Sequence, residues 1–217
     1  METDTIKEFK IVCIAVLIIC ICEAGSLFLR PDFSPITTIA FIRSAQIIFL
    51  ILLLVLTPGG LKFAGLSKRK GFAGFKTGLI WSFLFGIAAF VTSFILYLTG
   101  TNPLQFIHSN PPRDDLILFF LTGGLISPIA EEIFFRGIFY SFLRRLGILT
   151  AIFFSTSVFA LFHLSNGGLP VFQIVGGLVF ALSFEYSKSL VTPIVIHVLG
   201  NMAIFSITLI VADYLFI

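Results

Sequence analysis

Long apolar runs, separated by short polar or glycine- and proline-rich breaks, cover almost the whole chain. A helix that crosses a bilayer needs about 20 mainly apolar residues. Seven segments reach or approach this length: 9–28, 36–57, 75–98, 115–142, 148–164, 170–186 and 190–214. The fifth and sixth are short and can be partly re-entrant, so about seven spans are expected, between six and eight. The pattern predicts an all-α, polytopic transmembrane helical bundle.

Composition supports lipid as the main solvent of the chain. Hydrophobic residues make up 58% and charged residues 12% of the sequence, and the mean hydropathy is +1.09. Soluble domains average roughly 45–50% apolar and about 25% charged residues. Because no polar stretch is long enough to fold separately, residues 1–217 are expected to form a single membrane domain. The first apolar run is interpreted as an uncleaved span, with Cys13, Cys20 and Cys22 as packing residues.

Basic residues predict the orientation in the membrane, because lysine and arginine collect on cytoplasmic loops. With the N-terminus inside, the outer loops hold only Arg30 and Arg113. The prediction is a multi-pass protein of the cell membrane, of bacterial inner-membrane type, with a cytoplasmic N-terminus and an outer C-terminus. This topology accounts for the net charge of +3 without a nucleic-acid partner. The inner side then holds ten basic residues: Lys7, Lys10, Lys62, Lys68, Arg69, Lys70, Lys76, Arg144, Arg145 and Lys188.

Three of the apolar segments contain ionisable or polar side chains, which are costly inside a bilayer and therefore suggest function. They stand in the strings AEEIFFRG, FALFH and HVLGN of the fourth, fifth and seventh segments. The third histidine, His108, falls in an outer loop and is interpreted as incidental. The candidate residues are Glu131, Glu132, Arg136, Phe159, His163, His197 and Asn201.

Helical geometry gives the two glutamates different surroundings. Residues four apart share a helix face, so Glu132 is expected to pair with Arg136. Glu131 points about 100° away from Glu132 and is left free for chemistry. His197 and Asn201 are also four apart and can face one cavity.

Glu131 in the fourth segment and His163 in the fifth are expected to lie at the same depth in the membrane. Glu131 lies 15 residues before Leu146, and His163 lies 16 residues after Gly147. At a rise of 1.5 Å per residue, both stand roughly 22–24 Å from the turn between the two helices. Phe159, one turn before His163, is expected to shield the imidazole from lipid. The polar pair of the seventh segment agrees less well, at about 10–20 Å past the inner loop.

Such a constellation supports hydrolysis by water. A carboxylate beside an imidazole can remove a proton from water as a general base, and a second imidazole with an amide can donate hydrogen bonds to an oxyanion. Two histidines and a carboxylate are also a known zinc set. The HExxH spacing is absent, however, and Arg136 disfavours a dication, so no cofactor is expected and zinc is kept as the alternative. The same groups can also form a purely structural polar network.

The motifs resemble those of the CAAX prenyl protease type II and bacteriocin-processing family of membrane endopeptidases. Its signature is EExxxR, FxxxH and HxxxN on successive membrane helices, and all three occur here in order, within roughly residues 115–205. The resemblance implies an intramembrane protease that cleaves a membrane-anchored protein or peptide. Because members of the family were long described as metalloproteases, the resemblance leaves the zinc question open, and the glutamic type is favoured on the residues alone. It implies that Glu131 and His163 activate water and that His197 and Asn201 stabilise the tetrahedral intermediate. Glu132, Arg136 and Phe159 would then have supporting roles.

Two non-proteolytic alternatives use the same residues. A proton-coupled carrier would employ the glutamates and histidines as a relay, with Glu23, Glu185 and Asp213 as further members. Such a carrier favours inverted repeats, and no matching halves are found in the sequence. An immunity or scaffold protein would retain the motif residues without catalysis.

Overall fold

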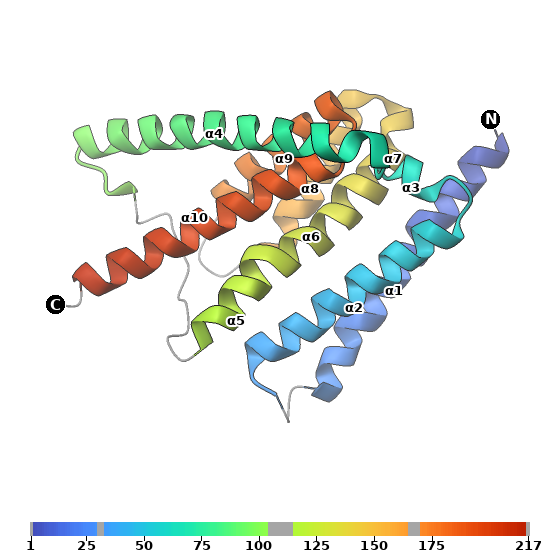
Figure 1. Cartoon of the computed structure of the whole chain (residues 1–217), viewed down its shortest axis with the longest axis horizontal. Coiled ribbons are helices and arrows are strands. Elements are labelled where there is room, and N and C mark those ends of the chain that lie inside the picture. Colours follow the sequence, from blue (N-terminus) through green and yellow to red (C-terminus); the bar gives the residue numbers. More distant parts are fainter. Residues whose placement is uncertain (1, 30–32, 104–114, 165–169, 216–217) are drawn as a thin grey trace.

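The computed structural model describes residues 2–29, 33–103, 115–164 and 170–215, and all regular elements in these ranges are helical. The predicted helical membrane bundle is confirmed (Figure 1). Within the described part, five helices are long and apolar enough to cross a membrane, and two shorter apolar helices stand where the fifth and sixth segments were expected. His108, Arg30, Arg113 and the side chain of Asp213 lie outside the described part.

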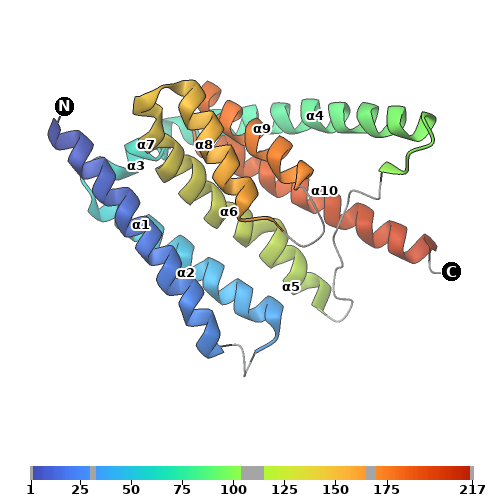
Figure 2. The same cartoon turned by 180° about the vertical axis from the view of Figure 1, so that it is seen from behind.

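The first two helices form a hairpin along one side of the bundle (Figures 1 and 2). They are α1 (Glu2–Leu29) and α2 (Pro35–Leu56). Ser34 precedes α2, and its hydroxyl accepts a hydrogen bond from the Thr37 N–H at 3.3 Å. A side-chain acceptor at this position, followed by proline, is a typical helix start. Since α2 also contacts the helix that carries the glutamates, the hairpin forms a wall beside it.

After the short α3 (Gly60–Phe63), α4 (Lys68–Leu98) crosses the bundle and packs on α10 (Val191–Leu215). The predicted start of α4 at residue 75 was therefore too late. A Cβ atom at Gly74 would lie 2.2 Å from the Ser189 hydroxyl oxygen, and one at Gly78 would lie 2.7 Å from Val195 Cβ. Glycine at these two positions therefore lets α4 approach its neighbour closely, as small residues do between membrane helices.

Residues 116–146 form one continuous span, called the motif helix below, in which the type of helix changes along its length. The glutamates lie in a short α-helical stretch between two π-helical stretches, in which each N–H bonds to the carbonyl five residues earlier. The motif helix lies at the centre of the bundle, because every residue of its second π-helical stretch except Phe139 is buried. Its parts are α5 (Leu116–Leu121), π-helical η3 (Thr122–Ile126), α6 (Ser127–Glu132), π-helical η4 (Ile133–Tyr140), α7 (Ser141–Leu143) and 3-10 helical η5 (Arg144–Leu146).

Two shorter helices, α8 (Ile148–Leu161) and α9 (Val171–Ser187), pack against each other. α8 also contacts η4, and α9 contacts α10, so the pair closes the side of the motif helix opposite the α1–α2 hairpin (Figure 2). The fifth segment was predicted to extend to residue 164, but α8 ends at Leu161. His163 consequently stands in the turn that follows the helix.

Candidate active site

Glu132 lies at the centre of a buried ion-pair network. Its Oε1 atom accepts a hydrogen bond from Arg136 Nη1 at 2.9 Å and lies 2.9 Å from His197 Nδ1. Arg136 Nη2 donates to the Gly177 carbonyl at 3.1 Å. Both side chains of the Glu132–Arg136 pair are 0% exposed. The predicted pairing is confirmed, and the contacts with α9 and α10 extend it to three helices.

Three phenylalanine rings enclose the guanidinium group. Arg136 Cζ lies 4.7 Å from the ring centre of Phe159, 5.2 Å from that of Phe180 and 5.8 Å from that of Phe135. The quadrupole of an aromatic ring attracts a cation at such distances. Phe180 also stacks on His197, with ring centres 4.4 Å apart. Phe180 was not predicted, because nothing local distinguishes it among the 28 phenylalanines of the chain.

Glu131 faces both histidines. Its Oε2 atom lies 3.8 Å from His197 Nε2 and 4.0 Å from His163 Nε2. The glutamate side chain is 13% exposed and that of His163 is 30% exposed, whereas Glu132 is fully enclosed. The expected common level of Glu131 and His163 is confirmed. Glu131 is thus the carboxylate that stays partly open while its neighbour is held in the ion-pair network.

The other ring nitrogen of each histidine is bound to an acceptor. His163 Nδ1 lies 2.8 Å from the Phe159 carbonyl. That carbonyl is available because the His163 backbone N–H bonds to the Ala160 carbonyl instead, at 3.0 Å. A carbonyl or carboxylate oxygen only accepts, so Nδ1 must donate in His163 and, toward Glu132, in His197. Both histidines therefore present Nε2 to Glu131.

Asn201 binds a different part of the motif helix. Its Nδ2 donates to the Gly123 carbonyl at 2.9 Å. In η3 the Ser127 N–H bonds to the Thr122 carbonyl, so the Gly123 carbonyl would next receive the N–H of residue 128. Residue 128 is Pro128, which has no N–H to donate. The asparagine amide thus supplies the hydrogen bond that the proline leaves unmade, and it ties α10 to η3.

Other charged groups near helix ends have structural partners. Glu185 accepts hydrogen bonds from the Tyr140 hydroxyl at 2.8 Å and from Arg144 Nε at 2.8 Å. Glu23 forms an ion pair with Arg43 at 3.2 Å. Glu185, one of the residues considered for a relay, therefore joins α9 to the end of the motif helix. The Tyr140 contact had no signal in the sequence, because it connects residues far apart in the chain.

The Glu131 and histidine atoms lie farther apart than the ligands of a tetrahedral zinc ion. A tetrahedral zinc site with bonds of roughly 2.0–2.1 Å has ligand atoms about 3.3 Å apart, and the distances from Glu131 Oε2 to the two Nε2 atoms are longer, at 3.8 and 4.0 Å. The described ranges contain no group of three or more histidine, cysteine or acidic residues arranged to hold a metal ion.

Comparison with known proteins finds similarity in the part of the chain that carries the motifs. Residues 113–203 match the family described as type II CAAX prenyl endopeptidase Rce1-like. This segment is similar to the Rce1-like family. It runs from the start of the motif helix into α10 and contains all seven candidate residues, so the resemblance seen in the three motifs is confirmed.

One curated relative is the membrane-embedded CAAX protease MroQ of Staphylococcus aureus (strain USA300). It is 31% identical to this chain over 93 residues. The match covers 40% of this chain and only 36% of MroQ, so the shared region is a minor part of each protein. No solved structure matches the chain.

Proposed function

We propose that this Rce1-like chain is an intramembrane endopeptidase, which hydrolyses a peptide bond of a membrane-associated substrate with water activated by Glu131 and His163. The observation that carries the proposal is the meeting of Glu131 with the Nε2 atoms of two histidines, at 3.8 and 4.0 Å. These distances are too long for direct hydrogen bonds and suit contacts bridged by water.

In the first step, the catalytic water donates one hydrogen to Glu131 Oε2 and the other to His163 Nε2. Its oxygen bonds to the scissile carbonyl carbon while its proton passes to Glu131, and the carbonyl electron pair moves to the oxygen. When the carbonyl re-forms, the carbon–nitrogen bond breaks, and Glu131 returns the proton to the leaving nitrogen. The Phe159 carbonyl, 2.8 Å from His163 Nδ1, keeps the ring in the tautomer that accepts through Nε2.

His197 and Asn201 are proposed as the donors that stabilise the oxyanion. The Asn201 amide has a second hydrogen besides the one bound to Gly123. The Nδ1–H of His197 is held by Glu132, so His197 can donate through Nε2 only when both ring nitrogens carry a proton. In the proposed mechanism Glu132 and Arg136 are positioning residues, because their fully buried ion pair holds His197 in place.

The proposed substrate is a membrane-anchored protein or peptide, reached from the lipid bilayer. The proposed location is the cell membrane, with the N-terminus in the cytoplasm, because the expected inner loops hold ten basic residues and the outer loops two. Prenylated tails, peptide bacteriocins and sorting tails are the substrate classes to be compared.

The test replaces Glu131 with Gln, which keeps the size of the side chain and removes the base. Glu23→Gln is the matched control, since it neutralises a carboxylate of α1 outside the site. In membranes of cells that express each variant, Glu131→Gln should leave a membrane-anchored precursor uncleaved, whereas the control should process it. Purified protein in liposomes should cleave that precursor, and a zinc chelator should not change the rate.

Equal processing by Glu131→Gln and the unmodified protein, at equal amounts in the membrane, would contradict the proposal. Loss of an ion flux in the same variant would instead favour a proton-coupled carrier. Loss of cleavage on addition of the chelator, restored by zinc, would replace the metal-free mechanism with a zinc-dependent one.

A further inference from the structure

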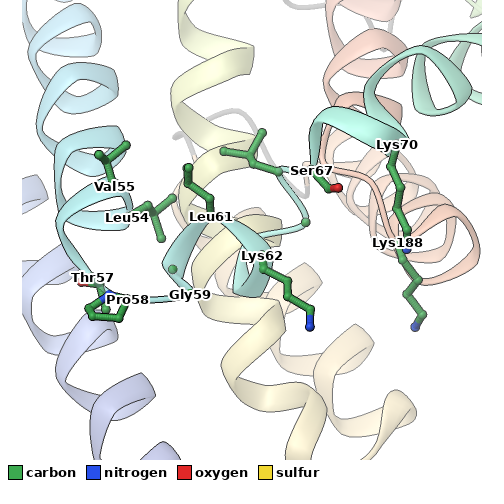
Figure 3. A pocket seen from close by; sticks show the side chains of 13 residues that line it. Leu54, Val55, Thr57, Pro58, Gly59, Leu61, Lys62, Ser67, Lys70 and Lys188 are labelled. Atoms are coloured by element: carbon green, nitrogen blue, oxygen red, sulfur yellow. The ribbon is translucent and has the colours of Figure 1, made fainter.

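A concave site lies at the end of the bundle where α2, α3, α4 and α9 meet. It is a cavity of about 500 Å³, and none of the candidate active-site residues lines it. Leu54, Leu61 and Leu66 supply apolar lining, and Lys62, Lys70 and Lys188 stand around it. Figure 3 shows the three lysine side chains pointing in one direction, while the Leu61 side chain points in the opposite direction. The cavity therefore has an apolar side and a basic side.

The basic side carries an excess of positive charge. Lys188 forms an ion pair with Glu185, but the same carboxylate also binds Arg144 at 2.8 and 2.9 Å. Lys62 and Lys70 are exposed, and neither forms an ion pair within the part of the chain that the structure describes. An anion that enters the cavity would therefore meet two lysines without having to displace a carboxylate from them.

The start of α4 adds a second attraction for an anion. Ser67 precedes this helix and lines the cavity, and its side chain makes no capping hydrogen bond. The first N–H groups of a long helix and its dipole favour negative charge, above all phosphate. The serine hydroxyl and the amino group of Lys70, in the first turn of the same helix, are available to the same ligand.

We propose that this cavity binds the phosphate headgroup of an anionic phospholipid. The cavity lies at the ends of α2 and α4, two helices that are long and apolar enough to cross a membrane. Lysine side chains near the ends of such helices reach toward the lipid headgroups. Basic pockets between membrane helices are known to hold anionic headgroups. The leucine side chains then contact the apolar part of the lipid, and the lysines contact the phosphate. The inference does not depend on the proposed hydrolysis.

The experiment measures binding of phosphatidylglycerol to the full chain in a neutral detergent, by native mass spectrometry. The cavity variant is Lys62→Gln with Lys70→Gln. The matched control is Lys10→Gln with Lys76→Gln, which removes two exposed lysines that do not line the cavity. Each lysine near a lipid phosphate strengthens binding of the lipid. Loss of both should therefore weaken the affinity of the cavity variant for phosphatidylglycerol about tenfold or more. The control should stay within about twofold on the same reasoning.

Two further measurements keep the result interpretable. The variant Lys62→Arg with Lys70→Arg preserves the charge and should retain binding, which separates loss of charge from loss of folding. Inorganic phosphate is added as the soluble competitor. Equal losses in the cavity and control variants would show a diffuse basic surface and overturn the proposal. Tight binding of inorganic phosphate that requires Lys62 and Lys70 and displaces the lipid would overturn the lipid assignment in favour of a soluble phosphate ligand.

Discussion

Replacement of Arg136 by Met tests the buried ion-pair network most directly. Methionine has a similar length and fits among the three phenylalanine rings that enclose the guanidinium, so the change removes charge with little loss of volume. It leaves the Glu132 carboxylate buried without its cation and the Gly177 carbonyl without its donor. Both lost contacts are short in the structure, at 2.9 and 3.1 Å.

The expected cost follows from the complete burial of both side chains. Removing one member of a buried ion pair destabilises a protein by about 3–5 kcal/mol, because an uncompensated charge remains. A carbonyl that loses its partner accounts for about 1–3 kcal/mol of this. Adding Glu132→Gln to Arg136→Met removes the stranded charge, and the glutamine oxygen can still accept from His197. The double variant should therefore recover about 2 kcal/mol relative to Arg136→Met alone.

The free energy of unfolding can be measured by titration with a denaturing detergent and followed by circular dichroism and by the fluorescence of Trp81. This single tryptophan packs on Tyr186 of α9, with ring centres 6.3 Å apart. Arg145→Met is the control, since Arg145 is partly exposed and pairs with Glu8, and it should cost less than about 1 kcal/mol. A cost below about 1 kcal/mol for Arg136→Met, with simple additivity in the double variant, would refute the network.

Three further changes have specific expected outcomes. Gly78→Ala should lower the free energy of unfolding by about 1–3 kcal/mol, because its Cβ would collide with α10; Gly86→Ala, which meets no atom within 4 Å, should cost nothing in the same unfolding measurement. Tyr140→Phe should cost about 1.5–3 kcal/mol through the lost hydrogen bond to the Glu185 carboxylate, and the absence of a measurable loss would contradict that bond. Asn201→Ala should lower kcat about 100- to 1000-fold in cleavage assays with folded protein if Asn201 binds the oxyanion.

Much of the site could be predicted from the sequence because helices convert spacing into position. The four-residue spacing of Glu132 and Arg136 predicted their pairing, and the hydrogen bond at 2.9 Å confirms it. Nearly equal distances from the turn predicted a common depth for Glu131 and His163, which lie 4.0 Å apart. These predictions hold because each involves only one helix or two helices joined by a tight turn.

Contacts that depend on packing could not be predicted in the same way. His197 stood too close to the inner loop by residue count, yet it meets Glu131. The reason is that Ser189 and Leu190, in the connection before α10, are buried in the bundle, with the Leu190 N–H bonded to the Gly65 carbonyl at 3.2 Å. The turn before α10 thus lies inside the bundle and does not mark the level of the membrane surface. Similarly, the basic residues around Lys70 suggested a loop, but α10 packs against this stretch and α4 continues through it.

Pro128 links the shape of the motif helix to the proposed chemistry. A proline in a helix leaves one carbonyl without its usual donor. In η3 this is the Gly123 carbonyl, which accepts a hydrogen bond from the Asn201 amide instead. Asn201 is thereby fixed by one amide hydrogen while the other stays free for an oxyanion. The same residue serves packing and, on the proposed mechanism, catalysis. A fall in kcat that exceeds the fall in the folded fraction would assign Asn201 to the reaction, whereas a fall in step with the folded fraction would leave it only the helix contact.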